Sequence, residues 1–119
     1  MLKKNKELAP ERINGNIAIL CSSESLNSAE SLISKFSDLS NISLYIEKCN
    51  KVSICNRKPS ILHLENDAVL QLECTLKQCF SPLDYSCTVC IGNNSSFLSI
   101  AENCNKCATP VYILVNYAS

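Results

Sequence analysis

The first half of the chain shows two different periods of hydrophobic positions. Residues 16–20, "NIAIL", form a continuous apolar run, which predicts a short strand buried on both faces. Apolar residues then recur at spacings of three and four, which predicts one stripe on a helix over about residues 27–39. The residues of this stripe are Leu26, Ala29, Leu32, Ile33, Phe36 and Leu39.

The flanks of this helix complete a recognisable unit. Asn27 is followed three residues later by Glu30, a spacing typical of a capping box at a helix start. Residues 42–49, "ISLYIEKC", are β-branched and aromatic, and predict a second strand. Strand, helix and strand with short links predict a βαβ unit, whose strands are parallel and whose crossover is right-handed.

The middle of the chain is ambiguous. Residues 51–55, "KVSIC", either extend the second strand or add a short one. In residues 60–79 the apolar positions alternate as in a hairpin that turns at Asn66-Asp67, but Asp67 could equally cap a helix. We favour a strand over 61–65 followed by a helix from about residue 67. Near the end, "TPVYILVNYA" predicts a last β-rich segment.

Nine cysteines change this picture, because four of them form two Cys-x-x-Cys pairs: Cys87, Cys90, Cys104 and Cys107. Four thiolates from two such pairs are the usual ligand set of a structural zinc. The sequence therefore predicts one Zn²⁺, with Phe97, Leu98 and Ile100 covering one side of the site and serving as candidate partner-binding residues. A redox pair and a catalytic zinc are the alternatives, the latter with a lone histidine, His63.

The remaining cysteines have no ligand spacing, and we interpret most of them as small buried hydrophobes. They are Cys21, Cys49, Cys55, Cys74 and Cys79. Cys79 is the one for which another role is most plausible.

The balance of positive and negative residues indicates which kinds of partner the chain could bind. Lys plus Arg equals Asp plus Glu, 11 each, over 119 residues, so no overall field favours nucleic acid or an anionic membrane. The start of the chain has no signal-like apolar segment, which predicts an intracellular protein. With only Gly15 and Gly92, the chain has no glycine-rich phosphate loop, and we predict no enzymatic activity.

The order of these segments resembles a family. A strand ending in Cys21-Ser22-Ser23, a helix, the "ISLYI" strand and "VSIC" come first. The strand end Leu64-Glu65-Asn66 follows, and then knuckles preceded by Tyr85 and Glu102. This order resembles the back half of a subunit of the transcription and repair factor TFIIH, which joins a von Willebrand A-type domain to zinc-binding modules and regulates an XPD-type helicase. A sister TFIIH subunit with an A-type domain and a four-cysteine finger is the runner-up.

The resemblance implies a truncated α/β protein: a partial von Willebrand A-like βαβ sheet with a four-cysteine zinc-ribbon-like module. The implied domains are a flexible lead-in at 1–12, the partial A-type domain at 13–80 and the zinc module at 84–119. The implied function is a nuclear, non-catalytic scaffold or regulatory subunit in transcription initiation and nucleotide excision repair. Its partners would be an XPD-type helicase and other TFIIH subunits, with little nucleic-acid binding and no membrane.

A different function is also compatible with the cysteine pattern. The chain could be a free-standing zinc-ribbon adaptor on a nucleic-acid or ribosomal particle. The region 84–119 holds Lys106 as its only basic residue, so phosphate contacts would be few.

Overall fold

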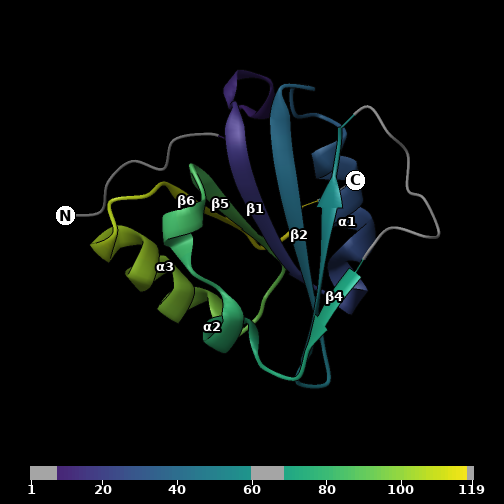
Figure 1. Cartoon of the computed structure of the whole chain (residues 1–119), viewed down its shortest axis with the longest axis vertical. Helices are drawn as coiled ribbons and strands as arrows, with labels where there is room; N and C mark the ends of the chain where they lie inside the picture. Colours follow the sequence, from purple (N-terminus) through teal and green to yellow (C-terminus); the bar gives the residue numbers. More distant parts are fainter. Residues whose placement is uncertain (1–7, 60–68, 118–119) are drawn as a thin grey trace.

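The computed structural model describes residues 8–59 and 69–117, which form a mixed α/β fold around one six-stranded sheet (Figure 1). The strands lie in the order β4-β3-β2-β1-β5-β6. They are β1 (Gly15–Ser22), β2 (Ser40–Lys48), β3 (Lys51–Arg57), β4 (Val69–Leu72), β5 (Cys87–Ile91) and β6 (Val111–Leu114). The helices are α1 (Leu26–Ile33), α2 (Leu76–Cys79) and α3 (Phe97–Lys106), with 3-10 turns at Pro10–Arg12, Ser23–Ser25 and Pro82–Asp84.

Strand β1 is the centre of the sheet. It pairs in parallel with β2 on one side and with β5 on the other, and β6 continues the parallel part beyond β5. Strands β3 and β4 add an antiparallel edge next to β2. Residues 17–21 of β1 are completely buried, because helices cover both faces of the sheet.

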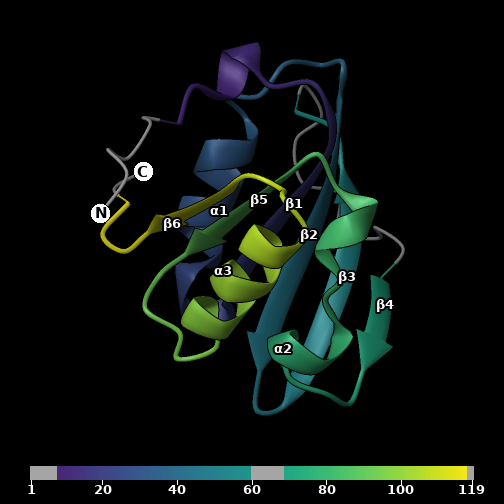
Figure 2. The same cartoon turned by 90° about the vertical axis from the view of Figure 1, so that its left-hand side faces the viewer.

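The two faces carry separate hydrophobic clusters. Helix α1 lies on one face, and α2 and α3 lie on the opposite face (Figures 1 and 2). Because side chains alternate along a strand, Ile17 and Ile19 of β1 pack on the α1 side, whereas Ala18 and Leu20 pack on the α2–α3 side. None of the helices in the described part of the chain is long and apolar enough to cross a bilayer.

The βαβ prediction is confirmed, but the helix is shorter than predicted. Strands β1 and β2 are parallel, in the register Ile17 to Ile42 and Ile19 to Leu44. Helix α1 ends at Ile33 rather than at residue 39. Serine hydroxyls then bond to nearby backbone groups, as in the contact of the Leu39 N–H with Ser37 Oγ, and such local bonds compete with helix continuation.

The predicted capping box at Asn27 and Glu30 is wrong. The 3-10 turn Ser23–Ser25 leads directly into α1, so the N-cap is Ser25, whose side chain makes no capping hydrogen bond. Glu30 therefore lies inside the helix, where its carboxylate is 3.4 Å from the guanidinium of Arg57 on β3. Arg57 is almost fully buried, and this ion pair ties α1 to the third strand.

The middle of the chain forms two strands, β3 and β4, and the second lies where the sequence analysis favours a helix. "KVSIC" belongs to a separate strand, β3, joined to β2 by a tight turn at Cys49-Asn50 with positive φ at both residues. The predicted helix from about residue 67 is wrong: residues 69–72 are strand β4, in agreement with the alternating pattern, and the helical turn α2 begins only at Leu76. The predicted strand at 61–65 lies outside the described residues.

The C-terminal segment belongs to the same sheet as the rest of the chain. The described part of the predicted zinc-ribbon-like module, residues 84–117, provides β5, α3 and β6, and β5 pairs directly with β1. The last β-rich prediction is confirmed by β6. Of the predicted lead-in, residues 8–12 are described, and they contain a 3-10 turn with Pro10 buried. The mixed α/β class is thus confirmed, with a sheet that runs through both predicted domains.

Burial of β1 makes a testable prediction about stability. Leu20 is 0% exposed on the α2–α3 side, whereas Leu39 is 75% exposed after α1. Leu20→Ala should lower the free energy of unfolding by about 2–5 kcal/mol, because it leaves a cavity in a packed core. Leu39→Ala should change it by less than about 0.5 kcal/mol. Urea unfolding followed by circular dichroism measures both, and equal losses would contradict this position of β1.

Candidate functional site

A cluster of polar groups lies where the parallel strands β1, β2 and β5 end. The Asn94 amide, in the loop after β5, donates to Glu47 Oε1 at 2.6 Å and to Ser22 Oγ at 3.4 Å. The second oxygen of Glu47 accepts the backbone N–H of Leu76 at 2.8 Å. We call Glu47 with its two partners, Asn94 and Leu76, the Glu47 bridge. It connects the end of β2 to the start of α2 and to the loop that precedes α3.

Helix α2 is short, and its position depends on its ends. Thr75 caps it with a capping box: the Gln78 N–H donates to Thr75 Oγ1, and the Thr75 N–H donates to Gln78 Oε1 at 2.9 Å. Leu76 is buried beneath the helix, and the ring of Phe80 follows it into the core. Four residues of helix would not hold without these contacts.

Phe80 belongs to an aromatic cluster with Tyr45 and Tyr85. Its ring meets that of Tyr45 edge-on at 5.4 Å and stacks on that of Tyr85 at 5.6 Å. The two tyrosine hydroxyls are hydrogen-bonded to each other, and burial, followed by this bond, raises the pKa of Tyr45. These rings fix the side of α2 that faces α3.

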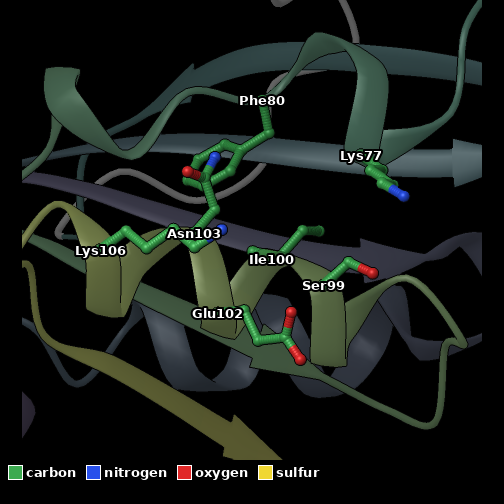
Figure 3. A pocket seen from close by; sticks show the side chains of 7 residues that line it. All are labelled: Lys77, Phe80, Ser99, Ile100, Glu102, Asn103 and Lys106. Carbon is green, nitrogen blue, oxygen red and sulfur yellow. The ribbon is translucent and has the colours of Figure 1, made fainter.

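A pocket of about 270 Å³ lies between α2 and α3 (Figure 3). We call it the α2–α3 pocket; its lining residues are Lys77, Phe80, Ser99, Ile100, Glu102, Asn103 and Lys106. Phe80 and Ile100, both buried, form its apolar floor. The Asn103 side chain points from α3 toward the Phe80 ring (Figure 3).

The three residues predicted to bind a partner all lie on α3, but in different environments. Leu98 is 73% exposed, whereas Phe97 and Ile100 are 2% and 3% exposed. Phe97 packs in the cluster beneath the helix, and Ile100 reaches the surface only through the α2–α3 pocket. Leu98 is therefore the one of the three that is freely available to a partner.

The four predicted zinc ligands do not converge. Alternation along β5 places Cys87 in the cluster on the α1 side and Cys90 in the cluster on the α3 side. Cys104 packs with Cys90, and Cys107 lies partly exposed at the end of α3. Over residues 8–59 and 69–117, no group of three or more His, Cys, Asp or Glu side chains could hold a metal ion. His63 is not among the described residues, and the zinc site stays a prediction.

The electrostatics of these thiols favour their neutral form. Burial, and then the nearby Cys104 thiol, raises the pKa of Cys87 to about 12, and burial also raises the pKa of Cys90. Burial raises the pKa of Cys104 as well, although the nearby hydroxyls of Thr88 and Thr109 oppose this shift. Burial thus favours the neutral thiol form of these cysteines, whereas metal ligands and nucleophiles react as thiolates.

The other cysteines divide by burial. Cys21 and Cys55 are buried, as predicted for small hydrophobes, whereas Cys49 is exposed in the turn after β2. Cys74 precedes α2, and Cys79 is its last residue, with a thiol that donates to the Leu76 carbonyl at 3.8 Å. Burial, and then the neighbouring Cys74 thiol, raises the pKa of Cys79 to about 12, which favours the neutral thiol at neutral pH.

Sequence reasoning missed the polar members of the pocket and the Glu47 bridge. Ser99, Asn103 and Lys106 line one stripe of α3, and their spacing of four and three is a helical signal. The same segment also joins the two Cys-x-x-Cys pairs, which favours interpreting it as a loop over a metal rather than as a helix. Glu47 could not have been found in this way, since its partners are 29 and 47 residues away.

Compared with known proteins, the chain matches no family model, no curated protein and no solved structure. A functional assignment therefore has to rest on the residues of this chain and on the geometry of its fold.

The Glu47 bridge should contribute measurably to stability. Glu47→Ala leaves the Leu76 N–H without its acceptor, which should cost about 1–3 kcal/mol of unfolding free energy. Glu73→Ala is the matched control, because the 3.9 Å contact of Glu73 with Lys51 is on the surface and is worth about 0–1 kcal/mol. Amide exchange at Leu76 should quicken only in Glu47→Ala. Unchanged exchange at Leu76 would argue against the bridge.

Replacing single cysteines separates core packing from metal ligation. Cys90→Ser places a hydroxyl in the core and should cost about 1–3 kcal/mol, whereas Cys107→Ser, at a partly exposed position, should cost less than about 1 kcal/mol. Zinc content by mass spectrometry and urea unfolding are measured together. Loss of one zinc per chain with large, similar destabilisation in both variants would instead establish ligation.

Proposed function

We propose that the chain is a non-catalytic scaffold or regulatory subunit that acts through protein–protein contacts. This is the role that its resemblance to a TFIIH core component implies, in transcription initiation and nucleotide excision repair. Its expected partners are other TFIIH subunits, including an XPD-type helicase, and its expected location is the nucleus.

The observation that carries the proposal is the outer surface of α3. Leu98 is 73% exposed on α3, the helix whose Ser99, Ile100 and Asn103 line the α2–α3 pocket, and the sequence predicts it as a partner-binding residue. An exposed leucine alone is ordinary, so the proposal also draws on the pocket with an apolar floor that the same helix lines. The inner face of α3, formed by Phe97, Ile100 and Cys104, is buried against the core, so this helix is held in place.

The carboxyl ends of the parallel strands give further support. In open α/β sheets, ligands usually bind in the crevice at these ends, where the strand order reverses. Here that place lies between β1 and β5, and the polar groups of Glu47 and Asn94 bond to each other and to backbone N–H groups. A carboxylate used in this way holds loops in place, which suits a structural role.

Two finer parts of the resemblance belong to the same proposal. The parallel βαβ unit of β1, α1 and β2 is compatible with a partial von Willebrand A-like sheet. The implied structural Zn²⁺, bound by Cys87, Cys90, Cys104 and Cys107, would require β5 to present Cys87 and Cys90 on one side. The proposal of a docking subunit does not depend on that metal.

Affinity purification of the tagged full chain from its own cells tests the proposal. We expect TFIIH subunits, identified by mass spectrometry, to be recovered with the wild type. Leu98→Glu should reduce that recovery about tenfold, since a hot-spot side chain carries about 1.4 kcal/mol or more. Leu39→Glu, similarly exposed but outside the α3 surface, is the control.

Recovery without any TFIIH subunit would overturn the TFIIH assignment. Equal recovery with both leucine variants would leave the assignment and remove Leu98 from the contact. A complex with nucleic acid whose yield falls steeply with salt would favour the zinc-ribbon adaptor instead.

A further inference from the structure

We propose that the α2–α3 pocket binds one apolar side chain of a partner peptide whose neighbouring residues are acidic. This inference rests on the proposed docking function and adds the chemistry of the partner. Three features of the pocket point to this occupant: its size, its apolar floor, and two lysines that form no ion pair within the described residues.

The size of the pocket favours a single side chain. Its volume of about 270 Å³ is below the roughly 300–1,000 Å³ of sites that enclose drug-sized molecules. Phe80 and Ile100 provide an apolar floor, and both are fixed in the core cluster. An aliphatic or aromatic side chain entering from outside would find these two surfaces already in place.

The charges of the pocket favour acidic neighbours for that side chain. Lys77 comes from α2 and Lys106 from the last turn of α3, and both are exposed (Figure 3). Within the described residues, neither lysine has a salt bridge or a side-chain hydrogen bond. Glu102 is the one acidic residue of the lining, so the lining keeps a net charge of +1. Carboxylates on either side of an inserted side chain would complement the two ammonium groups.

Ser99 and Asn103 add hydrogen-bonding capacity between the lysines. They lie on the same stripe of α3 as Lys106, one turn apart along the helix. The Asn103 amide can donate to and accept from a peptide backbone. An extended segment laid along α3 would thus meet a polar group beside the apolar floor and a cation near each end.

The same charges argue against a nucleic-acid occupant. Two lysines would neutralise few phosphates, and Glu102 lies beside them. Binding to a nucleic-acid backbone depends on several such contacts. The geometry therefore favours a peptide.

Selection from two displayed peptide pools tests the proposal with the full-length chain. Both pools share a central Leu or Phe; its neighbours are Asp or Glu in one pool and Lys or Arg in the other. We expect enrichment from the acidic pool only. Dissociation constants for an enriched peptide are then measured by fluorescence polarisation.

Matched variants locate the binding. Lys77→Glu combined with Lys106→Glu should weaken the acidic peptide about tenfold or more, since each lost charge contact becomes a repulsion. Lys48→Glu combined with Lys58→Glu makes the same change in net charge at exposed positions outside the pocket, and should have little effect. Asn103→Trp, which fills the hollow, should block the peptide without altering net charge. Circular dichroism confirms that each variant is folded.

The outcomes separate this inference from the proposed function. No enrichment, enrichment of the basic pool, or equal weakening by both lysine pairs would overturn the pocket's proposed chemistry. TFIIH subunits recovered equally by wild type and by the pocket variants would leave the scaffold function standing and overturn the role of the pocket in it. Acidic peptides bound in the pocket, with no TFIIH subunit recovered, would support the pocket and reject that assignment.

Discussion

The carboxylate of Glu47 connects the three segments that position the α2–α3 pocket: the end of β2, the start of α2 and the loop before α3. It sits at the end of β2 and accepts one hydrogen bond from the start of α2 and one from the loop before α3. The first backbone N–H groups of a helix have no partner within the helix, so the Leu76 N–H needs this acceptor. The two walls of the α2–α3 pocket come from α2 and α3, which are well separated along the chain. The Glu47 bridge attaches the start of α2 and the loop before α3 to the end of the same strand, β2.

The parts of the fold that could be predicted are those in which local pattern and burial agree. The run "NIAIL" is largely apolar because β1 is buried on both faces, and the stripe of α1 reaches as far as Ile33 in the register expected. Beyond Ile33 the apolar stripe no longer corresponds to a helix. Phe36 is buried although it lies in a turn, and Leu39 is exposed. The apolar positions of residues 69–72 are compatible with the period of a helix and with that of a strand. Their pairing with β3 is what makes them a strand. Such pairing is a tertiary effect that no short window of sequence contains.

The cysteine spacing does not by itself specify a backbone conformation. In a tight turn, residues three apart can direct two sulfurs to one metal, whereas in a strand the same two residues point to opposite faces. The residues between and after Cys87 and Cys90 are Thr88, Val89 and Ile91, which are β-branched and favour a strand. That local signal competed with the knuckle interpretation and agrees with β5. The conformation also bears on the chemistry, because burial favours the neutral thiol whereas metal ligation requires the thiolate.

The surface that remains for recognition is small, and its rigidity compensates for its size. The chain has no net charge, so a partner would not be attracted over long distances, and contact specificity has to come from the pocket itself. Phe80 is fixed by Tyr45 and Tyr85, and Ile100 by the packing of α3, so binding would order little of the protein. A preformed apolar floor lowers the entropic cost of association, whereas the two exposed lysines give up side-chain freedom when they pair. The apolar contact should therefore supply most of the affinity, and the lysines should determine which sequences are accepted.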